Sequence, residues 1–221
     1  MRGADSDGVL FDHCRGSRIG LPEAVFSPGK PWPILLSLLE RFQSQPVLFT
    51  RLENEIFAQA PADLRQKYDY DPISRTAFAV TQSDQGDFAR VAVVSAGSSD
   101  AQVAREAART LFFLGYHQTL YEDSGVAGIW RLTGRLEEIN RHEVIIVVAG
   151  LDAALASVLG GLTPRPIIAV PTSVGYGLAR AGESALASML VSCSPGVTVM
   201  NIDNGYGAAC AAARILRLLA R

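Results

Sequence analysis

Five short apolar runs after Arg90 constrain the fold of this chain more than any other feature. Each run ends in small or polar residues, and a segment with helical spacing of apolar positions follows it. The runs are residues 91–95, 117–121, 144–148, 167–170 and 197–202. The helical segments that follow them are residues 101–114, 125–138, 152–159, 176–191 and 208–219. Strands that alternate with helices and are apolar on both faces indicate a covered parallel sheet. We therefore predict an α/β fold with a doubly wound, flavodoxin-like parallel sheet.

The first part of the chain has a looser pattern. Residues 1–90 hold seven of the eleven prolines. The elements predicted there are a helix over residues 32–42 and short strands over residues 47–50 and 76–80. The polar segment 83–87 is typical of a linker. We predict a small N-terminal α/β appendage, residues 1–86, and a second domain, residues 87–221.

Charge and cysteine usage exclude several classes of protein. A net charge of −2 provides no basic surface for nucleic acid. No apolar stretch is long enough to span a bilayer, and residues 1–5 do not resemble a signal peptide, so we expect no membrane association. The three cysteines, Cys14, Cys193 and Cys210, lack CxxC spacing. This pattern favours a reducing, cytoplasmic location over a disulfide-stabilised fold.

Residues 144–221 are unusually poor in charge, with only eight charged side chains. The outer helices of a monomeric doubly wound protein need a polar face. We therefore expect neighbouring subunits to cover the helices over 181–191 and 208–219. The alternative is an alanine-rich, weakly polar surface on a monomer.

Small and polar residues follow every apolar run, at the edge where open parallel sheets bind ligands. Glycines allow close backbone approach, and helix N-termini present free N–H groups to anions, so the set fits a phosphorylated substrate. The candidate binding residues are Gly97, Ser98, Ser99, Asp100, Asp123, Gly150, Thr172, Ser173, Gly175, Tyr176, Gly177, Asp203 and Asn204. For any single loop, ordinary helix capping by Ser99, Asp100, Ser124 or Asp152 is the commoner explanation. The five loops taken together favour ligand binding. If Ser99 and Asp100 bind substrate, replacing both with Ala should weaken binding without unfolding the protein.

Several well-known sites are absent from the sequence. It contains no GxGxxG, P-loop or GxSxG motif. The histidines, His13, His117 and His142, are scattered without metal-ligand spacing, and we expect them on the surface or in linkers. We therefore predict no metal site formed by protein side chains.

Cys193 lies between a predicted helix and the last predicted strand. Its neighbours are small and polar, and a Pro-Gly turn follows, which favours a partly open position. A single intracellular cysteine is more often a small buried hydrophobe than a nucleophile, so both interpretations stay open. Cys210 lies within an alanine-rich helical segment and is expected to serve packing.

Long motifs in the chain resemble the LarB family. They are residues 148–150 (VAG), 160–162 (GGL), 166–177 (PIIAVPTSVGYG), 189–199 (MLVSCSPGVTV) and 201–209 (NIDNGYGAA). The N-terminal part is similar to the family's opening signature at Asp12, Arg15, Arg18, Gly20, Pro22, Glu23, Val25, Phe26, Gly29 and Lys30, and to its short strand at Thr50 and Arg51. The resemblance covers residues 9–215.

The related PurE group of aminoimidazole ribonucleotide carboxylases and mutases is a weaker match. Residues 97–100 resemble the Ser/Asp nucleotide-binding loop that both groups place after the first strand. PurE proteins carry a catalytic His after the second strand, where this chain has the segment 122–128 (EDSGVAG) without a histidine. They also lack the N-terminal appendage, so the resemblance favours LarB over PurE.

The resemblance to LarB implies a two-part reaction on nicotinic acid adenine dinucleotide. Carboxylation of the pyridinium ring by carbon dioxide or bicarbonate, with cleavage of the phosphoanhydride, would give AMP and pyridinium-3,5-biscarboxylic acid mononucleotide. This is the first step of nickel-pincer cofactor synthesis. The resemblance assigns the nucleophile to Cys193. It assigns the general acid/base to Asp152, where the family has Glu.

The resemblance also implies a homo-oligomer, with the related families suggesting an octamer. No tightly bound cofactor is expected, although hydrolysis of the anhydride could use Mg²⁺ held mainly by phosphates. Because Cys193 precedes a strand, we expect it at the sheet edge opposite the ligand loops of its own subunit, near Asp152 of another. The open alternatives are a PurE-like ribonucleotide carboxylase or mutase and a nucleotide-binding regulator without turnover.

Overall fold

The computed structural model describes residues 8–83, 86 and 89–219, and contacts divide the chain into two units, Met1–Ser83 and Asp84–Arg221. Positions 84, 85 and 87 of the predicted linker, and residues 1–5, for which no signal peptide was expected, lie outside the described residues. Among the residues that are described, no helix is both long and apolar enough to cross a membrane.

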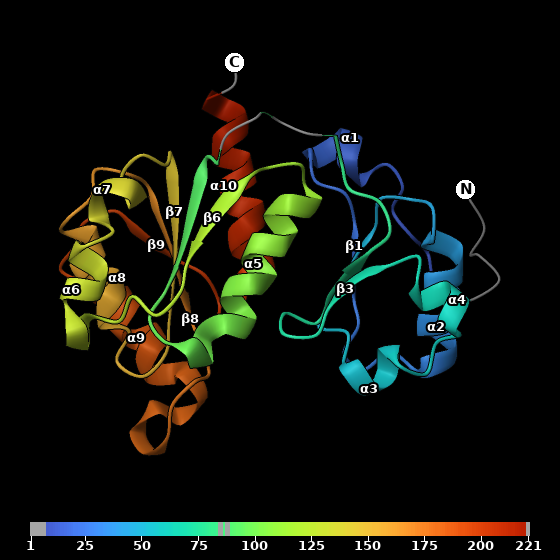
Figure 1. Ribbon diagram of the computed structural model, residues 1–221, viewed down its shortest axis with the longest axis horizontal. Helices are drawn as coiled ribbons and strands as arrows, with labels where there is room; N and C mark the ends of the chain where they lie inside the picture. The colour runs from blue at the N-terminus through green and yellow to red at the C-terminus, as the bar shows by residue number, and fades with distance from the viewer. Residues whose placement is uncertain (1–7, 84–85, 87–88, 220–221) are drawn as a thin grey trace. The chain divides into compact units, whose positions relative to one another are not determined.

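The N-terminal unit is built around a four-stranded mixed sheet in the order β1-β2-β4-β3 (Figure 1). Its elements are α1 (Arg15–Ile19), β1 (Ala24–Phe26), α2 (Trp32–Phe42), β2 (Leu48–Thr50), α3 (Asn54–Phe57), α4 (Ala62–Arg65), β3 (Asp69–Asp71) and β4 (Thr76–Phe78). Helix α2 has the predicted bounds, and it buries Leu35, Leu38, Leu39 and Phe42 at the spacing of one helical face. The unit therefore has a core of its own.

The C-terminal unit contains a five-stranded, all-parallel sheet in the order β6-β5-β7-β8-β9. The strands are β5 (Val91–Ser95), β6 (Gln118–Tyr121), β7 (Val144–Ala149), β8 (Ile167–Pro171) and β9 (Val197–Val199). Every residue of β5, β7 and β8 is buried, as their continuous apolar sequences require in a sheet covered on both faces. This is the flavodoxin-like strand order, and it confirms the predicted fold class.

Helices cover both faces of this sheet (Figure 1). Helices α5 (Ala101–Phe113) and α10 (Gly205–Leu219) pack together on one face, and the other face carries α6 (Trp130–Thr133), α7 (Leu136–Ile139), α8 (Ala154–Gly160) and α9 (Glu183–Leu190). Most alanines of α10 are buried against its own chain, namely Ala208, Ala209, Ala212 and Ala213. The low charge of α10 therefore has an explanation within the subunit, alongside the predicted interface.

Two predicted helices are wrong in form. The segment predicted as a helix over 125–138 is broken into η2 (Val126–Gly128), α6 and α7. The segment predicted over 176–191 begins as η3 (Gly177–Gly182), in which Arg180 and Ala181 are left-handed, and only then becomes α9. Gly182 explains the second break, because its φ is +97° and a Cβ there would lie 2.8 Å from the Thr172 carbonyl oxygen.

Candidate active site

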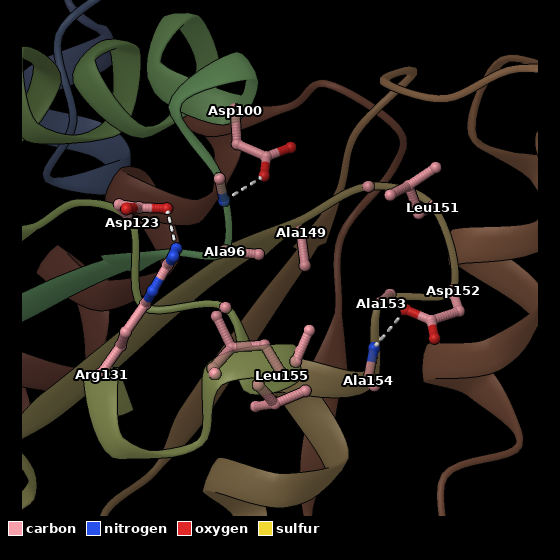
Figure 2. A pocket seen from close by; sticks show the side chains of 16 residues that line it. Ala96, Asp100, Asp123, Arg131, Ala149, Leu151, Asp152, Ala153, Ala154 and Leu155 are labelled. Carbon is pink, nitrogen blue, oxygen red and sulfur yellow. Dashed lines mark hydrogen bonds and ion pairs between the residues drawn. The ribbon is translucent and has the colours of Figure 1, made fainter. Parts of the chain in front are cut away.

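A pocket of 690 Å³ lies at the carboxyl ends of β5, β6 and β7 (Figure 2). Strand order reverses between β5 and β7, and this switch point is where flavodoxin-like sheets bind ligands. The volume falls within the range of small-molecule sites, about 300–1,000 Å³. Of the predicted residues, Gly97, Asp100, Asp123, Gly150 and Asp152 line it.

Asp100 holds three of the ligand loops together. It is only 4% exposed, and its carboxylate accepts hydrogen bonds from the Gly97 N–H at 2.9 Å and the Thr172 hydroxyl at 2.7 Å. Burial raises the pKa of Asp100, and hydrogen bonds from Thr172, Gly97 and Gly150 partly oppose that shift. The double replacement of Ser99 and Asp100 with Ala should therefore cost stability as well as binding, contrary to the expectation from sequence.

The loop after β7 is closely packed at Gly150. A Cβ at this position would lie 2.5 Å from the Val174 carbonyl oxygen and 2.6 Å from Thr172 Oγ1. The residues that follow are strained, because Leu151 and Ala153 both have positive φ values, 53° and 54°. Each such residue costs about 1–2 kcal/mol in an L-amino acid. Strain of this kind concentrates at functional sites, which supports a binding role for this loop.

Asp152 lies between the two strained residues and borders the pocket (Figure 2). Its side chain is exposed, and its carboxylate accepts one long hydrogen bond of 3.3 Å from the Ala154 N–H at the start of α8. It therefore acts as a weak cap, and its carboxylate remains accessible for proton transfer.

Arg131 is a charged pocket residue that the sequence analysis did not identify. It reaches the pocket from α6 and forms an ion pair with Asp123, with 2.8 Å between Nη1 and Oδ1 (Figure 2). Both side chains are partly exposed, 40% and 56%, so the pair adds little stability but places a guanidinium where a phosphate could bind. Its position was hidden because the sequence predicted an uninterrupted helix there.

The remaining predicted binding residues lie outside the lining of this pocket. Ser98 and Ser99 are exposed in η1 (Ser98–Asp100), the turn that precedes α5. After β8, Ser173 donates its N–H to Asp203 Oδ1 at 2.8 Å, which joins the loops after β8 and β9. Gly175, Tyr176 and Gly177 follow as exposed residues.

Asn204 has a structural role. Its side-chain oxygen accepts the Gly207 N–H at 2.8 Å, so it caps the N-terminus of α10. The buried carboxylate of Glu106 also accepts an N–H from this end of the helix, from Tyr206 at 3.2 Å. Helix capping, which the sequence analysis did not assign to Asn204, therefore accounts for the position of its side chain.

Cys193 is exposed and lies in the turn between α9 and β9. The serines beside it bind the middle of α8: Ser192 hydrogen-bonds Ser157 at 2.7 Å, and the Ser194 hydroxyl donates to the Ser157 carbonyl at 2.6 Å. This turn precedes a parallel strand, so it lies at the sheet edge opposite the pocket of its own subunit.

The histidine expectation is wrong for His142. This residue is buried, its Nε2 lies 3.0 Å from Thr119 Oγ1, and its Nδ1 lies 3.1 Å from the Glu138 carbonyl oxygen. Its place is therefore structural, between α7 and β6. Within the described part of the chain, no three His, Cys, Asp or Glu side chains group closely enough to hold a metal ion.

Comparison with known proteins places this architecture in a family. Residues 90–220 match the model of the AIR carboxylase family, and residues 4–82 match that of the LarB/PurE-like N-terminal domain. An uncharacterised protein of Methanocaldococcus jannaschii is 34% identical over 222 residues, which covers 96% of this chain and 85% of that protein.

Two relatives are named as mutases. The N5-carboxyaminoimidazole ribonucleotide mutase of M. jannaschii is 33% identical over 133 residues, 58% of this chain and 79% of that protein. A probable mutase of the same name from Methanothermobacter thermautotrophicus is 30% identical over 136 residues, 61% of this chain and 39% of that protein. With an AIR carboxylase domain that follows a LarB/PurE-like N-terminal domain, the chain belongs to the LarB/PurE-related family.

Proposed function

We propose that this protein carboxylates the pyridinium ring of nicotinic acid adenine dinucleotide and hydrolyses its phosphoanhydride. The products would be AMP and pyridinium-3,5-biscarboxylic acid mononucleotide, as in the first step of nickel-pincer cofactor synthesis. One observation carries the proposal, namely that a LarB/PurE-like N-terminal domain precedes the AIR carboxylase domain in a single chain.

The extent of the alignments supports this choice. The two mutases align over 58% and 61% of the chain, close to the share that the AIR carboxylase domain occupies. The uncharacterised relative aligns over 96% of the chain, so its alignment extends beyond the AIR carboxylase domain. The N-terminal unit therefore distinguishes this chain from the ribonucleotide enzymes.

The chemistry explains why such a reaction needs a thiol. A pyridinium ring is electron-poor, so none of its carbons attacks carbon dioxide. Addition of the Cys193 thiolate at the carbon para to nitrogen gives an enamine whose unsubstituted meta carbon is nucleophilic. That carbon forms the new bond to carbon dioxide, a base removes its proton, and expulsion of the thiolate restores aromaticity. Water then cleaves the phosphoanhydride.

Asp152 is our candidate for the base. Its carboxylate is accessible at the pocket rim, and it is one methylene shorter than the glutamate expected from the resemblance. Carbon dioxide or bicarbonate is the co-substrate. Mg²⁺ bound by the substrate's phosphates could assist the hydrolysis, and activity in excess chelator would test that role.

Assembly must supply Cys193 to the pocket. We propose that a neighbouring subunit of a homo-oligomer, an octamer in our proposal, brings Cys193 near Asp152. Two exposed apolar side chains beside the cysteine favour a covered position, Leu190 at 66% and Val191 at 80% exposure. A monomer in light scattering at micromolar concentration would refute this arrangement.

A ribonucleotide carboxylase or mutase is the second candidate, and the similarity to two mutases favours it. The loop after β6, residues 122–128, contains no histidine, whereas the PurE proteins that this chain resembles carry a catalytic one there. A nucleotide-binding regulator without turnover is the third candidate, motivated by the shorter Asp152.

One experiment tests the proposed reaction. The protein is incubated with nicotinic acid adenine dinucleotide and bicarbonate, and the products are analysed by mass spectrometry. We expect AMP and a carboxylated mononucleotide from wild-type protein and neither product from Cys193→Ser. Recovery of only the starting dinucleotide would count against the proposal.

A further inference from the structure

Trp130 is the most exposed large apolar side chain on the short helix α6, with 71% of its surface accessible. Single exposed apolar side chains are common on folded proteins, so the exposure of Trp130 gains meaning only from the pocket beside it. The described reaction site does not involve Trp130.

A second pocket of 360 Å³ lies beside this indole. Asp123, Trp130, Arg131, Gly134 and Arg135 line it. Asp123 and Arg131 also line the main pocket, so the two pockets share a wall. A ligand longer than the main pocket could therefore extend past the Asp123–Arg131 ion pair into this second pocket.

The walls of the second pocket are held in place before any ligand binds. Arg131 is fixed by Asp123, and its guanidinium carbon lies over the indole ring, 5.5 Å from the centroid. Arg135 donates to the Glu122 carbonyl oxygen at 2.6 Å and to Ser124 Oγ at 3.1 Å. A guanidinium therefore lies over the indole ring, while 71% of Trp130 remains accessible.

Gly128 lies close to both the indole and the main pocket. A Cβ at this position would lie 3.3 Å from Trp130 Nε1 and 3.2 Å from Arg131 Nε. Gly128 also lines the main pocket, so the edge of the indole lies at its rim.

We propose that Trp130 and the second pocket bind the purine base of the substrate, with the adjacent phosphates at Arg131. Nucleobases stack on aromatic side chains, and guanidinium groups bind phosphate oxygens in pairs of hydrogen bonds. With Arg131 and Arg135 against the single carboxylate of Asp123, the lining of the second pocket carries a net positive charge, which favours the phosphates next to the base. This proposal rests on the proposed function, because it places the AMP half of the proposed dinucleotide substrate in the second pocket.

Tryptophan fluorescence tests the subsite directly, because the chain has only two tryptophans. The other, Trp32, packs against the core of the N-terminal unit. In the Trp32→Phe variant, titration with AMP should quench the remaining Trp130 fluorescence in a saturable manner. Nicotinic acid mononucleotide, which lacks the purine, should quench it less.

Substitutions give the energetic test. Trp130→Ala should weaken AMP binding in calorimetry by roughly 5- to 150-fold, the range for loss of one base-stacking aromatic. Trp130→Phe, which keeps a ring, should lose much less. Ile129→Ala is the matched control, since it truncates the neighbouring exposed apolar side chain, which lines neither pocket.

The outcomes separate this proposal from the proposed function. AMP affinity that is unchanged in Trp130→Ala overturns the subsite, even if wild-type protein carboxylates the dinucleotide. A smaller oligomer in that variant with unchanged AMP affinity also overturns it and makes Trp130 an interface residue. AMP stacking without carboxylation leaves the subsite standing and removes only the proposed reaction.

Discussion

Gly150→Ala tests whether the loops around Asp100 form one packed unit. The added methyl group would lie 2.5 Å from the Val174 carbonyl oxygen, which cannot move without shifting the loop after β8, and 2.6 Å from Thr172 Oγ1. Displacing Thr172 would also lengthen its 2.7 Å hydrogen bond to Asp100. The substitution should therefore disturb packing and a buried polar contact together.

The expected magnitude follows from these two effects. Overpacking costs about 1–3 kcal/mol, and loss of a hydrogen bond to a charged group costs about 1.5–3 kcal/mol. Because one displacement causes both, we expect about 3 kcal/mol of lost unfolding free energy, or a drop in Tm of roughly 10 °C for a chain of this size. Thermal unfolding followed by circular dichroism measures it.

Gly97→Ala is the matched control. Gly97 lies in the same cluster of loops, but its φ of −129° suits any residue, and a Cβ there would meet Asp100 Oδ2 at an ordinary 3.6 Å. We expect this variant to melt within about 3 °C of wild type, since Gly→Ala at a compatible position changes stability by less than about 1 kcal/mol. Equal Tm values for the two variants would refute the packing argument.

Three further predictions concern ionisable residues and the thiol. Burial raises the pKa of Asp100, so ionisation of its carboxyl group opposes folding. The stability of the protein is therefore highest below the pKa of the unfolded chain, 3.8, and falls as pH rises through the pKa of the folded protein. Relative to Asp100→Asn, wild-type protein should therefore lose unfolding free energy across that window in denaturant titrations, and a flat difference would contradict this. Asp152→Ala should abolish carboxylation while changing the unfolding free energy by less than about 0.5 kcal/mol, because the side chain is exposed. Asp152→Glu should retain activity. An active alanine variant would show that Asp152 is not the base. Cys193→Ser should fold and bind AMP normally, since Cys193 is exposed, yet show no covalent adduct or dihydropyridine absorbance with substrate; carboxylation at the wild-type rate would exclude the covalent mechanism.

The parallel sheet could be predicted from the sequence because burial on both faces leaves continuous apolar runs. Each predicted strand forms, and the loops that follow β5, β6 and β7 meet at the pocket because carboxyl ends of parallel strands share an edge. Helix α2 was predicted with its observed bounds because apolar residues recur at helical spacing along residues 32–42.

Features that depend on tertiary contacts could not be predicted in this way. The break at Gly182 depends on Ile202 and on the Thr172 carbonyl, which come from elsewhere in the fold, so local periodicity continued the helix through it. Strand β3 was missed because its sequence, Asp-Tyr-Asp, contains no apolar run. Arg131 was missed because the helix predicted over 125–138 was unbroken, which gave no cause to place its guanidinium in the pocket.

The most direct test of the proposed function is to identify which substrate the protein carboxylates. Wild-type protein is given ¹³C-labelled bicarbonate together with equal amounts of nicotinic acid adenine dinucleotide and aminoimidazole ribonucleotide, and labelled products are identified by mass spectrometry. We predict that label enters a pyridinium mononucleotide and that AMP is released in step with it. Label in the imidazole product, with the dinucleotide intact, would contradict the proposal and assign the chain to ribonucleotide carboxylation.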